Sequence, residues 1–171
     1  MVTSPLREQL IFSGAIRFGD FTLASGRKST VYIDIKKAIT SPKILQTIAS
    51  EVKKLDISFD AVAGVAVGGV PLAVAVSLAF NIPSVIIRKE QKGHGIASLT
   101  IGDVKDKKIL LIEDVTTSGG SAEYGITIIR DEGGIIDTVI SVADRDEGAE
   151  TLLSGLGIRL IPLVTMGELV K

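Results

Sequence analysis

Residues 107–125 read KKILLIEDVTTSGGSAEYG, and this stretch decides the fold. Its first half is a nearly continuous apolar run, typical of a strand buried on both faces, which is predicted to leave the core at Glu113. Its second half places hydroxyl and glycine residues before an apolar periodic segment, which predicts a turn into a helix. A buried strand that leads directly into a helix is the repeating unit of a parallel α/β sheet.

The same alternation of strand and helix continues in both directions from this stretch. Strands are expected near residues 60–66, 84–88, 108–113, 135–143 and 158–163, and helices near 70–80, 120–131 and 145–155. The interval between Lys89 and Lys107 is polar and shows no helix pattern. The sequence therefore predicts the α/β class, with a parallel sheet covered by helices on both faces.

The N-terminal part of the chain follows a different pattern. Ser4-Pro5 and Ser41-Pro42 are helix-start signals, each followed by apolar residues at helical spacing. Between them, residues 16–35 alternate and contain glycines, which predicts a short antiparallel excursion. A chain of 171 residues is long enough for one domain with a substantial core, so residues 1–171 are expected to form a single domain.

The composition of the chain limits the kinds of molecule and surface that it can be expected to bind. The net charge of −1 gives no general attraction to nucleic acid or to an anionic membrane. The chain contains no cysteine, which excludes disulfides and thiolate chemistry and fits a cytoplasmic location. Residues 61–87 carry no charge and are long enough to span a bilayer, but glycines and prolines divide them into pieces suited to strand, turn and helix. We therefore expect no membrane association.

The turn after Glu113 and Asp114 has the composition of a phosphate site. Amide groups at a helix start are free to bind an anion, and the glycines of TTSGGS let the backbone approach it closely. The stretch has neither the P-loop pattern nor GxGxxG. The two acids suit ribose hydroxyls or a hydrated Mg²⁺ carried by a phosphorylated ligand. The alternative is ordinary capping of a helix, which accounts for single residues here but not for the whole set.

A second polar stretch, RKEQKGH at residues 88–94, holds three cations and the only histidine of the chain. Alone, it is typical of a solvated loop. The carboxyl ends of parallel strands meet at one edge of a sheet, so we expect this loop beside the phosphate turn, together with GVAVGG at residues 64–69. In that place it is expected to act as a lid over a pyrophosphate, with Gly93 and Gly95 as hinges.

These motifs resemble a known family. LLIEDVTTSGGSA is similar to the phosphoribosyl pyrophosphate (PRPP) motif of type I phosphoribosyltransferases. Two further stretches resemble orotate phosphoribosyltransferases, namely RKEQKGHG, which is similar to their catalytic loop, and FTLASGRKSTVYID, which is similar to their N-terminal segment. GVAVGGVPLA resembles their pyrophosphate-loop region, and ADRDEG resembles a turn whose arginine contacts orotate.

The resemblance implies an activity and an assembly. The activity is Mg²⁺-dependent transfer of the phosphoribosyl group from PRPP to N1 of orotate, which gives orotidine 5′-monophosphate and pyrophosphate in pyrimidine biosynthesis. The implied fold is a type I phosphoribosyltransferase core at residues 41–171, with a hood segment at 1–40 and a flexible catalytic loop at 89–107. The implied assembly is a homodimer that shares this loop across its interface. The resemblance implies no direct protein ligand for Mg²⁺, which is held mainly through PRPP.

The resemblance also implies a set of site residues. The catalytic residues are expected to be Arg88, Lys89, Lys92, His94 and Asp114. The PRPP site is expected to comprise Arg88, Lys89, Lys92, His94, Glu113, Asp114, Val115, Thr116, Thr117, Ser118, Gly119, Gly120 and Ser121. Orotate is expected at Thr117, Arg145, Tyr32 and Ile33. Ala24 and Gly68 depart from the family pattern, because lysine stands at these positions in many or some members.

Two other functions remain open at this point. Phosphoribosyltransferases for purine bases share the phosphate turn, although they do not share RKEQKGHG and FTLASG together. A regulator that senses PRPP without catalysis is the second alternative, and the loss of lysine at Ala24 and Gly68 favours it. The retained Lys92, His94, Glu113 and Asp114 favour an enzyme, as does the lack of a basic DNA-binding segment.

Overall fold

The central feature is a six-stranded sheet with the order β5-β4-β3-β6-β7-β8. The computed structural model describes residues 4–22, 26, 28–89 and 98–170. The strands are β3 (Ala61–Val65), β4 (Ser84–Ile87), β5 (Thr100–Ile101), β6 (Lys108–Thr116), β7 (Ile135–Asp144) and β8 (Arg159–Pro162). Neighbouring strands are parallel except for β5, which pairs antiparallel with β4 at one edge. The predicted α/β class with a mainly parallel sheet is confirmed.

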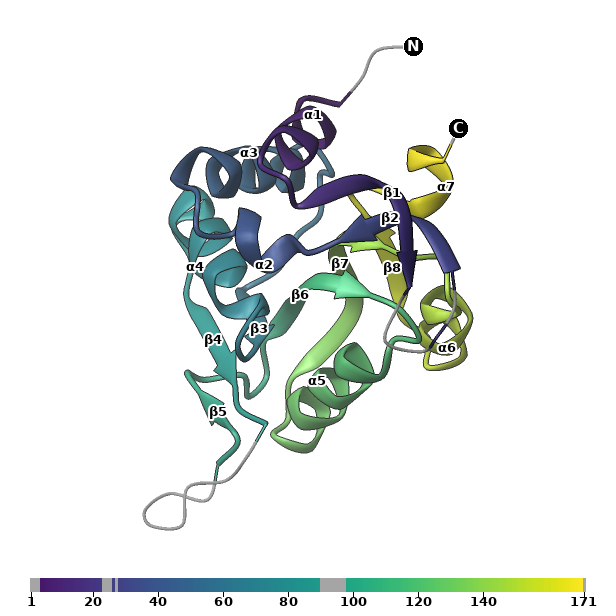
Figure 1. Ribbon diagram of the computed structural model, residues 1–171. Coiled ribbons are helices and arrows are strands. Elements are labelled where there is room, and N and C mark those ends of the chain that lie inside the picture. The colour runs from purple at the N-terminus through teal and green to yellow at the C-terminus, as the bar shows by residue number, and fades with distance from the viewer. Residues whose placement is uncertain (1–3, 23–25, 27, 90–97, 171) are drawn as a thin grey trace.

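Helices cover both faces of this sheet (Figure 1). One face packs against α3 (Pro42–Lys53) and α4 (Gly69–Phe80), and α1 (Pro5–Phe12) lies on α3. The other face packs against α5 (Gly120–Asp131) and α6 (Ala149–Gly155). Successive side chains of a strand point to opposite faces. In β6, Leu110 and Ile112 accordingly join the first core, while Ile109 and Leu111 join the second.

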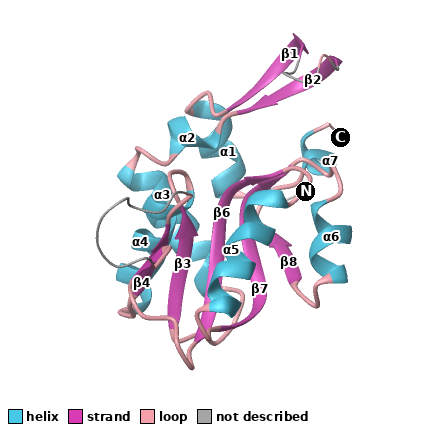
Figure 2. Ribbon diagram, turned by 90° about the horizontal axis from the view of Figure 1, so that it is seen from below, coloured by secondary structure: helices cyan, strands magenta, loops and turns pink. Residues whose placement is uncertain are grey.

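The N-terminal segment forms an antiparallel hairpin that projects beyond the sheet (Figure 2). Its strands are β1 (Ile16–Thr22) and β2 (Lys28–Ile33), and a short helix, α2 (Ile35–Ala38), leads from it toward α3. Buried apolar residues at the base of the hairpin join the core that contains α3 and α4. The hairpin confirms the expected antiparallel excursion at residues 16–35 and is anchored at one end only.

Two boundaries differ from those expected, and two short elements were not expected. Strand β6 does not end at Glu113 but continues to Thr116, because it stays paired with β7 as far as Asp144. Helix α6 begins at Ala149 rather than near 145, because residues 146–148 form a bend and Gly148, the N-cap, has a φ of 108°, which is not helical. The interval 89–107 contains the short strand β5, and α7 (Met166–Leu169) follows β8 behind a capping box at Thr165. Elements this short carry little periodic signal in the sequence.

The uncharged segment 61–87 folds as β3, α4 and β4. Gly64 and Gly69 allow α4 to start directly against β3, since a Cβ on Gly64 would lie 2.2 Å from the carbonyl oxygen of Gly69. The longest helices, α3, α4 and α5, have 12 residues each. Within the described ranges, no helix has the length and apolar character needed to cross a membrane.

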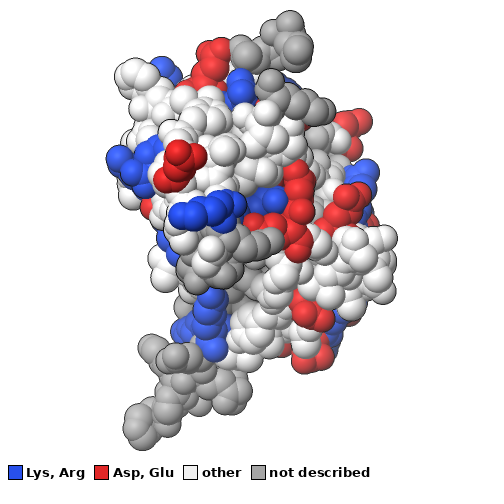
Figure 3. Space-filling model, turned by 45° about the vertical axis from the view of Figure 1, so that its right-hand side comes forward, with Lys and Arg blue, Asp and Glu red and all other residues white. Residues whose placement is uncertain are grey.

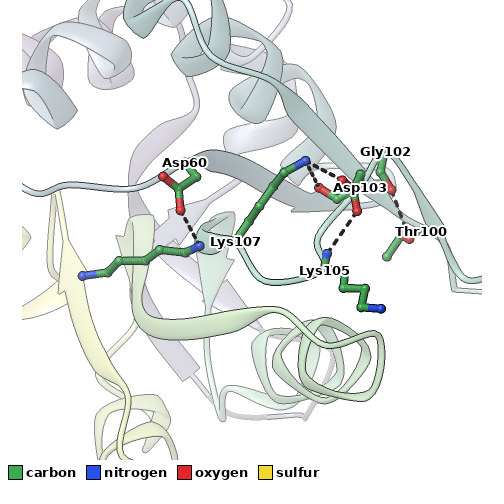
Figure 4. Close-up of polar contacts among 7 residues, drawn as sticks. Asp60, Thr100, Gly102, Asp103, Lys105 and Lys107 are labelled. Atoms are coloured by element: carbon green, nitrogen blue, oxygen red, sulfur yellow. Dashed lines mark hydrogen bonds and ion pairs between the residues drawn. The ribbon is translucent and has the colours of Figure 1, made fainter.

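Paired charges hold the loops at the amino ends of the strands, a part of the molecule called here the amino rim (Figure 4). Lys107 Nζ lies 2.7 Å from Asp103 Oδ2, and the Lys105 amide donates to Asp103 Oδ1 at 3.1 Å. Asp60 Oδ2 accepts the backbone amide of Lys108, the first residue of β6, at 2.7 Å. The opposite edge, where the parallel strands end, is the carboxyl rim.

Candidate active site at the carboxyl rim

A cleft of about 720 Å³ opens at the carboxyl rim between the hairpin and the ends of β3 and β6. Its volume is in the range of small-molecule sites. The residues that line it are Tyr32, Ile33, Asp34, Ile35, Lys36, Val65, Ala66, Val67, Gly68, Lys89, Glu113, Asp114, Val115, Thr117 and Ser121. Eight of these were predicted as site residues from the sequence: Tyr32, Ile33, Lys89, Glu113, Asp114, Val115, Thr117 and Ser121. The fold thus brings into one cleft residues from the hairpin, the pyrophosphate-loop region and the phosphate turn.

The two adjacent acids serve opposite faces of β6. Glu113 continues the series of Ile109 and Leu111 toward α5, and its Oε1 accepts a hydrogen bond of 3.0 Å from Ser121 Oγ in the first turn of that helix. Asp114 points toward the start of α4, where a Cβ on Gly68 would lie 2.2 Å from Asp114 Oδ2. A pair of acids at this point of the strand therefore reaches the starts of both helices that border the cleft.

Glu113 is only 3% exposed, although it lines the cleft. Burial raises its pKa to about 7, and the neighbouring charge of Asp114 acts in the same direction. The hydrogen bond from Ser121 and the charge of Lys89 act against this rise. A carboxyl group that titrates near neutral pH can either accept or donate a hydrogen bond when a ligand hydroxyl approaches.

The turn between β6 and α5 presents backbone amides to the cleft end of the sheet. Gly119 precedes the helix with a φ of 89°, a conformation that favours glycine. The carbonyl of Thr117 is tied to the start of α6 by a hydrogen bond of 3.0 Å from the Ala149 amide. The first amides of α5 have no acceptor within the helix and carry its positive dipole end. This geometry is that of an anion site at a helix start.

Comparison with known proteins identifies the family. The phosphoribosyl transferase domain family matches residues 34–153. Over 171 residues the chain is 68% identical to the orotate phosphoribosyltransferase of Methanospirillum hungatei, covering 100% of this chain and 99% of that protein.

The chain belongs to the orotate phosphoribosyltransferase family.

Solved structures of the orotate phosphoribosyltransferase family agree with this assignment. The crystal structure of the enzyme from Aeropyrum pernix matches with a TM-score of 0.81 at 34% identity, covering 96% of each chain. That of Mycobacterium tuberculosis, in complex with PRPP, matches with a TM-score of 0.80 at 25% identity and covers 99% of this chain and 100% of that one. The expected type I phosphoribosyltransferase fold is confirmed, and this family member is a transferase.

Apart from Arg145, the remaining predicted residues fall into four groups. Ser118, Gly119 and Gly120 form the turn and the start of α5, and Arg88 lies directly after β4. Lys92 and His94 fall outside the described residues, as does Ala24. Thr116 was expected in the phosphate turn, but it ends β6 with its side chain buried. Its hydroxyl donates to Asp144 Oδ1 at 2.7 Å, within a buried group that includes Ser141. Thr116 therefore has no hydroxyl directed at the cleft.

Arg145 lines a second cleft of about 790 Å³, between the hairpin and the end of β7. Its Nη2 lies 3.0 Å from Glu147 Oε1. The two clefts adjoin at an aromatic pair, because Phe21 lines the second, Tyr32 lines the first, and their ring centroids are 5.5 Å apart. The expected orotate residues are therefore divided between neighbouring hollows.

Several cleft residues were missed by the sequence reasoning. Asp34 and Lys36 line the first cleft beside Tyr32, and the charges of IDIKK that follow the hairpin motif were the available signal. Gly68 was regarded only as a lost lysine, yet its contact with Asp114 leaves no room for a side chain without movement. Acidic and basic side chains lie interspersed on the face shown in Figure 3, so the cleft relies on local groups to bind charged ligands.

Proposed function

We propose that this chain transfers the phosphoribosyl group of PRPP to N1 of orotate in a Mg²⁺-dependent reaction, as a homodimer in the cytoplasm. The observation that carries the proposal is the first cleft, which combines a helix-start anion site, two strand-end acids and Lys89. The high identity to orotate phosphoribosyltransferases favours orotate over a purine base. The lack of cysteine supports a reducing compartment.

The parts of PRPP fit different parts of the cleft. The 5′-phosphate belongs at the amides and hydroxyls of residues 117–121, because free amides and a helix dipole stabilise an anion there. The ribose hydroxyls belong at Glu113 and Asp114, which are acceptors at the end of β6. The pyrophosphate then lies toward Lys89 and Arg88, with Lys92 and His94 completing its cationic surroundings.

The chain's own groups have two tasks in the reaction. The bond between C1′ and the pyrophosphate oxygen breaks, and N1 of orotate gives up its proton and bonds to C1′. Positive charge develops on the ribose and negative charge on the leaving pyrophosphate. The lysine and arginine side chains stabilise the leaving group, and one such contact typically contributes a factor of about 10²–10³ in rate. The acids hold the ribose so that its C1′ faces the base.

The donor set fits a metal ion that arrives with the ligand. No group of three or more potential ligands from His, Cys, Asp and Glu gathers anywhere in the described ranges, so a cage of protein ligands is not seen there. Mg²⁺ commonly keeps waters and binds through one or two carboxylates plus substrate phosphates, and the carboxylate of Asp114 lines the cleft. When bound, Mg²⁺ would neutralise charge on the pyrophosphate.

Orotate is proposed to lie between the two clefts, against Tyr32 and Ile33. The guanidinium of Arg145 suits a bidentate pair with the carboxylate of orotate. Such a pair requires this side chain to exchange its present partner, Glu147, for the ligand.

Loss of orotate absorbance in the presence of PRPP and Mg²⁺ tests the proposal directly. We expect turnover with orotate, none in excess chelator, and no pyrophosphate release with adenine, guanine or xanthine. Turnover with a purine base and not with orotate would overturn the assignment, and full activity in chelator would overturn the Mg²⁺ requirement.

The shared loop can be tested by mixing inactive subunits. Lys92→Ala changes the loop and is expected to lower turnover by orders of magnitude without unfolding the chain. Asp114→Asn changes the strand-end acids, which belong to the other subunit if the loop is shared, and is also expected to inactivate the site. If the loop crosses the interface, a mixed dimer of the two variants contains one intact site and regains activity. Two variants that remain inactive after subunit exchange, verified by mass, would contradict the shared arrangement.

A further inference from the structure

Helix α5 makes side-chain contacts with the ends of two neighbouring strands, β6 and β4. Ser121 in the first turn donates a hydrogen bond to Glu113 at the end of β6. One turn later, the hydroxyl of Tyr124 donates to the backbone carbonyl of Arg88, the residue that follows β4, at 2.7 Å. Residues three apart on a helix lie on the same face, so both contacts come from the side of α5 that borders the cleft. The Tyr124 ring packs against the core under this helix.

The backbone of Arg88 is also fixed from its other side. Its amide donates to the carbonyl of Leu99 at 2.9 Å. The neighbours of Leu99 are Ser98 and Thr100, and both donate side-chain hydrogen bonds to the carboxylate of Glu132, the residue that follows α5. The carbonyl of Arg88 is therefore held directly by Tyr124 of α5, and its amide is held through residues 98–100 by Glu132, which follows α5.

Lys89 follows Arg88 and is the residue whose direction depends on this backbone. It lines the cleft with Glu113, and its charge acts on the Glu113 carboxyl. Lys89 is exposed, and its side chain has several rotatable bonds. The region that its ammonium group can reach is therefore set by the position and direction of its backbone. A backbone carbonyl without a partner leaves the peptide between Arg88 and Lys89 free to rotate.

We propose that Tyr124 is a positioning residue, which fixes the peptide after Arg88 so that the ammonium group of Lys89 is held over the cleft beside Glu113. The inference rests on the proposed function, because it assigns Lys89 to the pyrophosphate of PRPP. Tyr124 touches no reacting atom and acts only through Lys89.

Tyr124→Phe removes the hydroxyl and keeps the ring, and Thr127→Val is the matched control. Thr127 lies on the same helix, but its hydroxyl donates to the carbonyl of Glu123 within α5, on an exposed side. We expect Y124F to lower kcat/KM for PRPP by about tenfold, as one hydrogen bond allows, and to leave KM for orotate unchanged. T127V is expected to leave both constants unchanged. Both variants are compared at a temperature well below their measured Tm, so that loss of folded protein does not contribute.

A double-mutant cycle with Lys89→Ala separates positioning from a structural role. If Tyr124 acts through Lys89, Y124F has no further effect on kcat/KM in the K89A background. An equal effect of Y124F in both backgrounds would overturn the inference, as would Y124F activity equal to that of the parent. Failure of the proposed function looks different, because the parent enzyme would then show no turnover of orotate at all.

Discussion

The two rims of the sheet use the same side chain, a carboxylate, in opposite ways. At the carboxyl rim, Glu113 is buried and its pKa is raised to about 7. At the amino rim, Asp137 is half exposed and pairs with Lys108 at 2.8 Å, and this hydrogen-bonded pair lowers its pKa. Burial leaves Glu113 able to gain or lose a proton near neutral pH, whereas pairing with a surface lysine keeps Asp137 charged.

The surroundings of the clefts at the two rims also differ. At the carboxyl rim, Gly68 brings the backbone against the carboxylate of Asp114, and Gly119 lies in the turn that is proposed to bind the 5′-phosphate. A cleft of about 450 Å³ also exists at the amino rim, but Lys108, Asp137 and Arg159 line it, and the first two are already paired. The charges of Lys108 and Asp137 are therefore directed at each other rather than at a ligand.

The largest expected effect is that of Asp114→Asn at the carboxyl rim. The change keeps the shape and removes the charge that is proposed to face the ribose and the metal-bound ligand. We expect kcat/KM for PRPP to fall by about 10²–10³-fold, with an unchanged circular dichroism spectrum. Asp137→Asn is the matched change at the amino rim and should leave kcat/KM intact. Activity of D114N within threefold of the parent would remove the distinction between the rims.

Gly68→Ala is expected to have the next largest effect. The added Cβ meets the carboxylate of Asp114, which must move away from the cleft. We expect kcat/KM to fall by about tenfold or more, because small displacements of binding groups have large effects on rate. Gly155→Ala serves as control, because a Cβ at that helical glycine meets nothing within 4 Å. Equal activity of G68A and G155A would show that the contact with Asp114 has no role.

The pH dependence of the free energy of unfolding, measured without ligand, should show the titration of the buried Glu113. Glu113 keeps its proton to about pH 7 in the folded state and to about pH 4.5 when exposed. The folded state therefore binds more protons between these values, and this group makes the free energy of unfolding fall by up to about 3 kcal/mol as the pH rises. Glu113→Gln should flatten that part of the profile in thermal melts from pH 4.5 to 8. Parallel profiles for parent and variant would contradict a buried titrating Glu113.

The smallest expected effect is that of Asp137→Asn at the amino rim on the free energy of unfolding. Its pH dependence has the opposite sign to that of Glu113. The lowered pKa of Asp137 means that its contribution is present above its ordinary pKa and is lost as the pH falls. Because the pair with Lys108 is half exposed, D137N should lower the free energy of unfolding by at most about 1 kcal/mol at pH 7. Denaturant titrations of parent and D137N at pH 7 and pH 3 measure this difference. A larger loss of stability at pH 3 than at pH 7 would contradict the lowered pKa of Asp137.

The sequence predicted the features that repeat and missed those that depend on neighbours. The apolar run of β6 and the glycine turn after it carry a strong local signal, so the strand, α5 and the acids were located correctly. The end of β6 was placed at Glu113, because its pairing with β7 as far as Thr116 is not visible in a polar stretch. For the same reason the buried bond from Thr116 to Asp144 and the bond from Tyr124 to Arg88 could not be foreseen. Each joins residues more than 25 positions apart.

The alternation along β6 also restricts how this gene can change length. Glu113 and Asp114 face different helices only because each occupies a fixed place in a two-residue repeat. Removing one codon between those for Lys108 and Ile112 would exchange the faces of the two acids or send the apolar side chains of β6 before the deletion to the opposite core, although every amino acid type needed for the site would remain. Insertions and deletions among related genes should therefore gather in the loops at the amino rim and spare this strand.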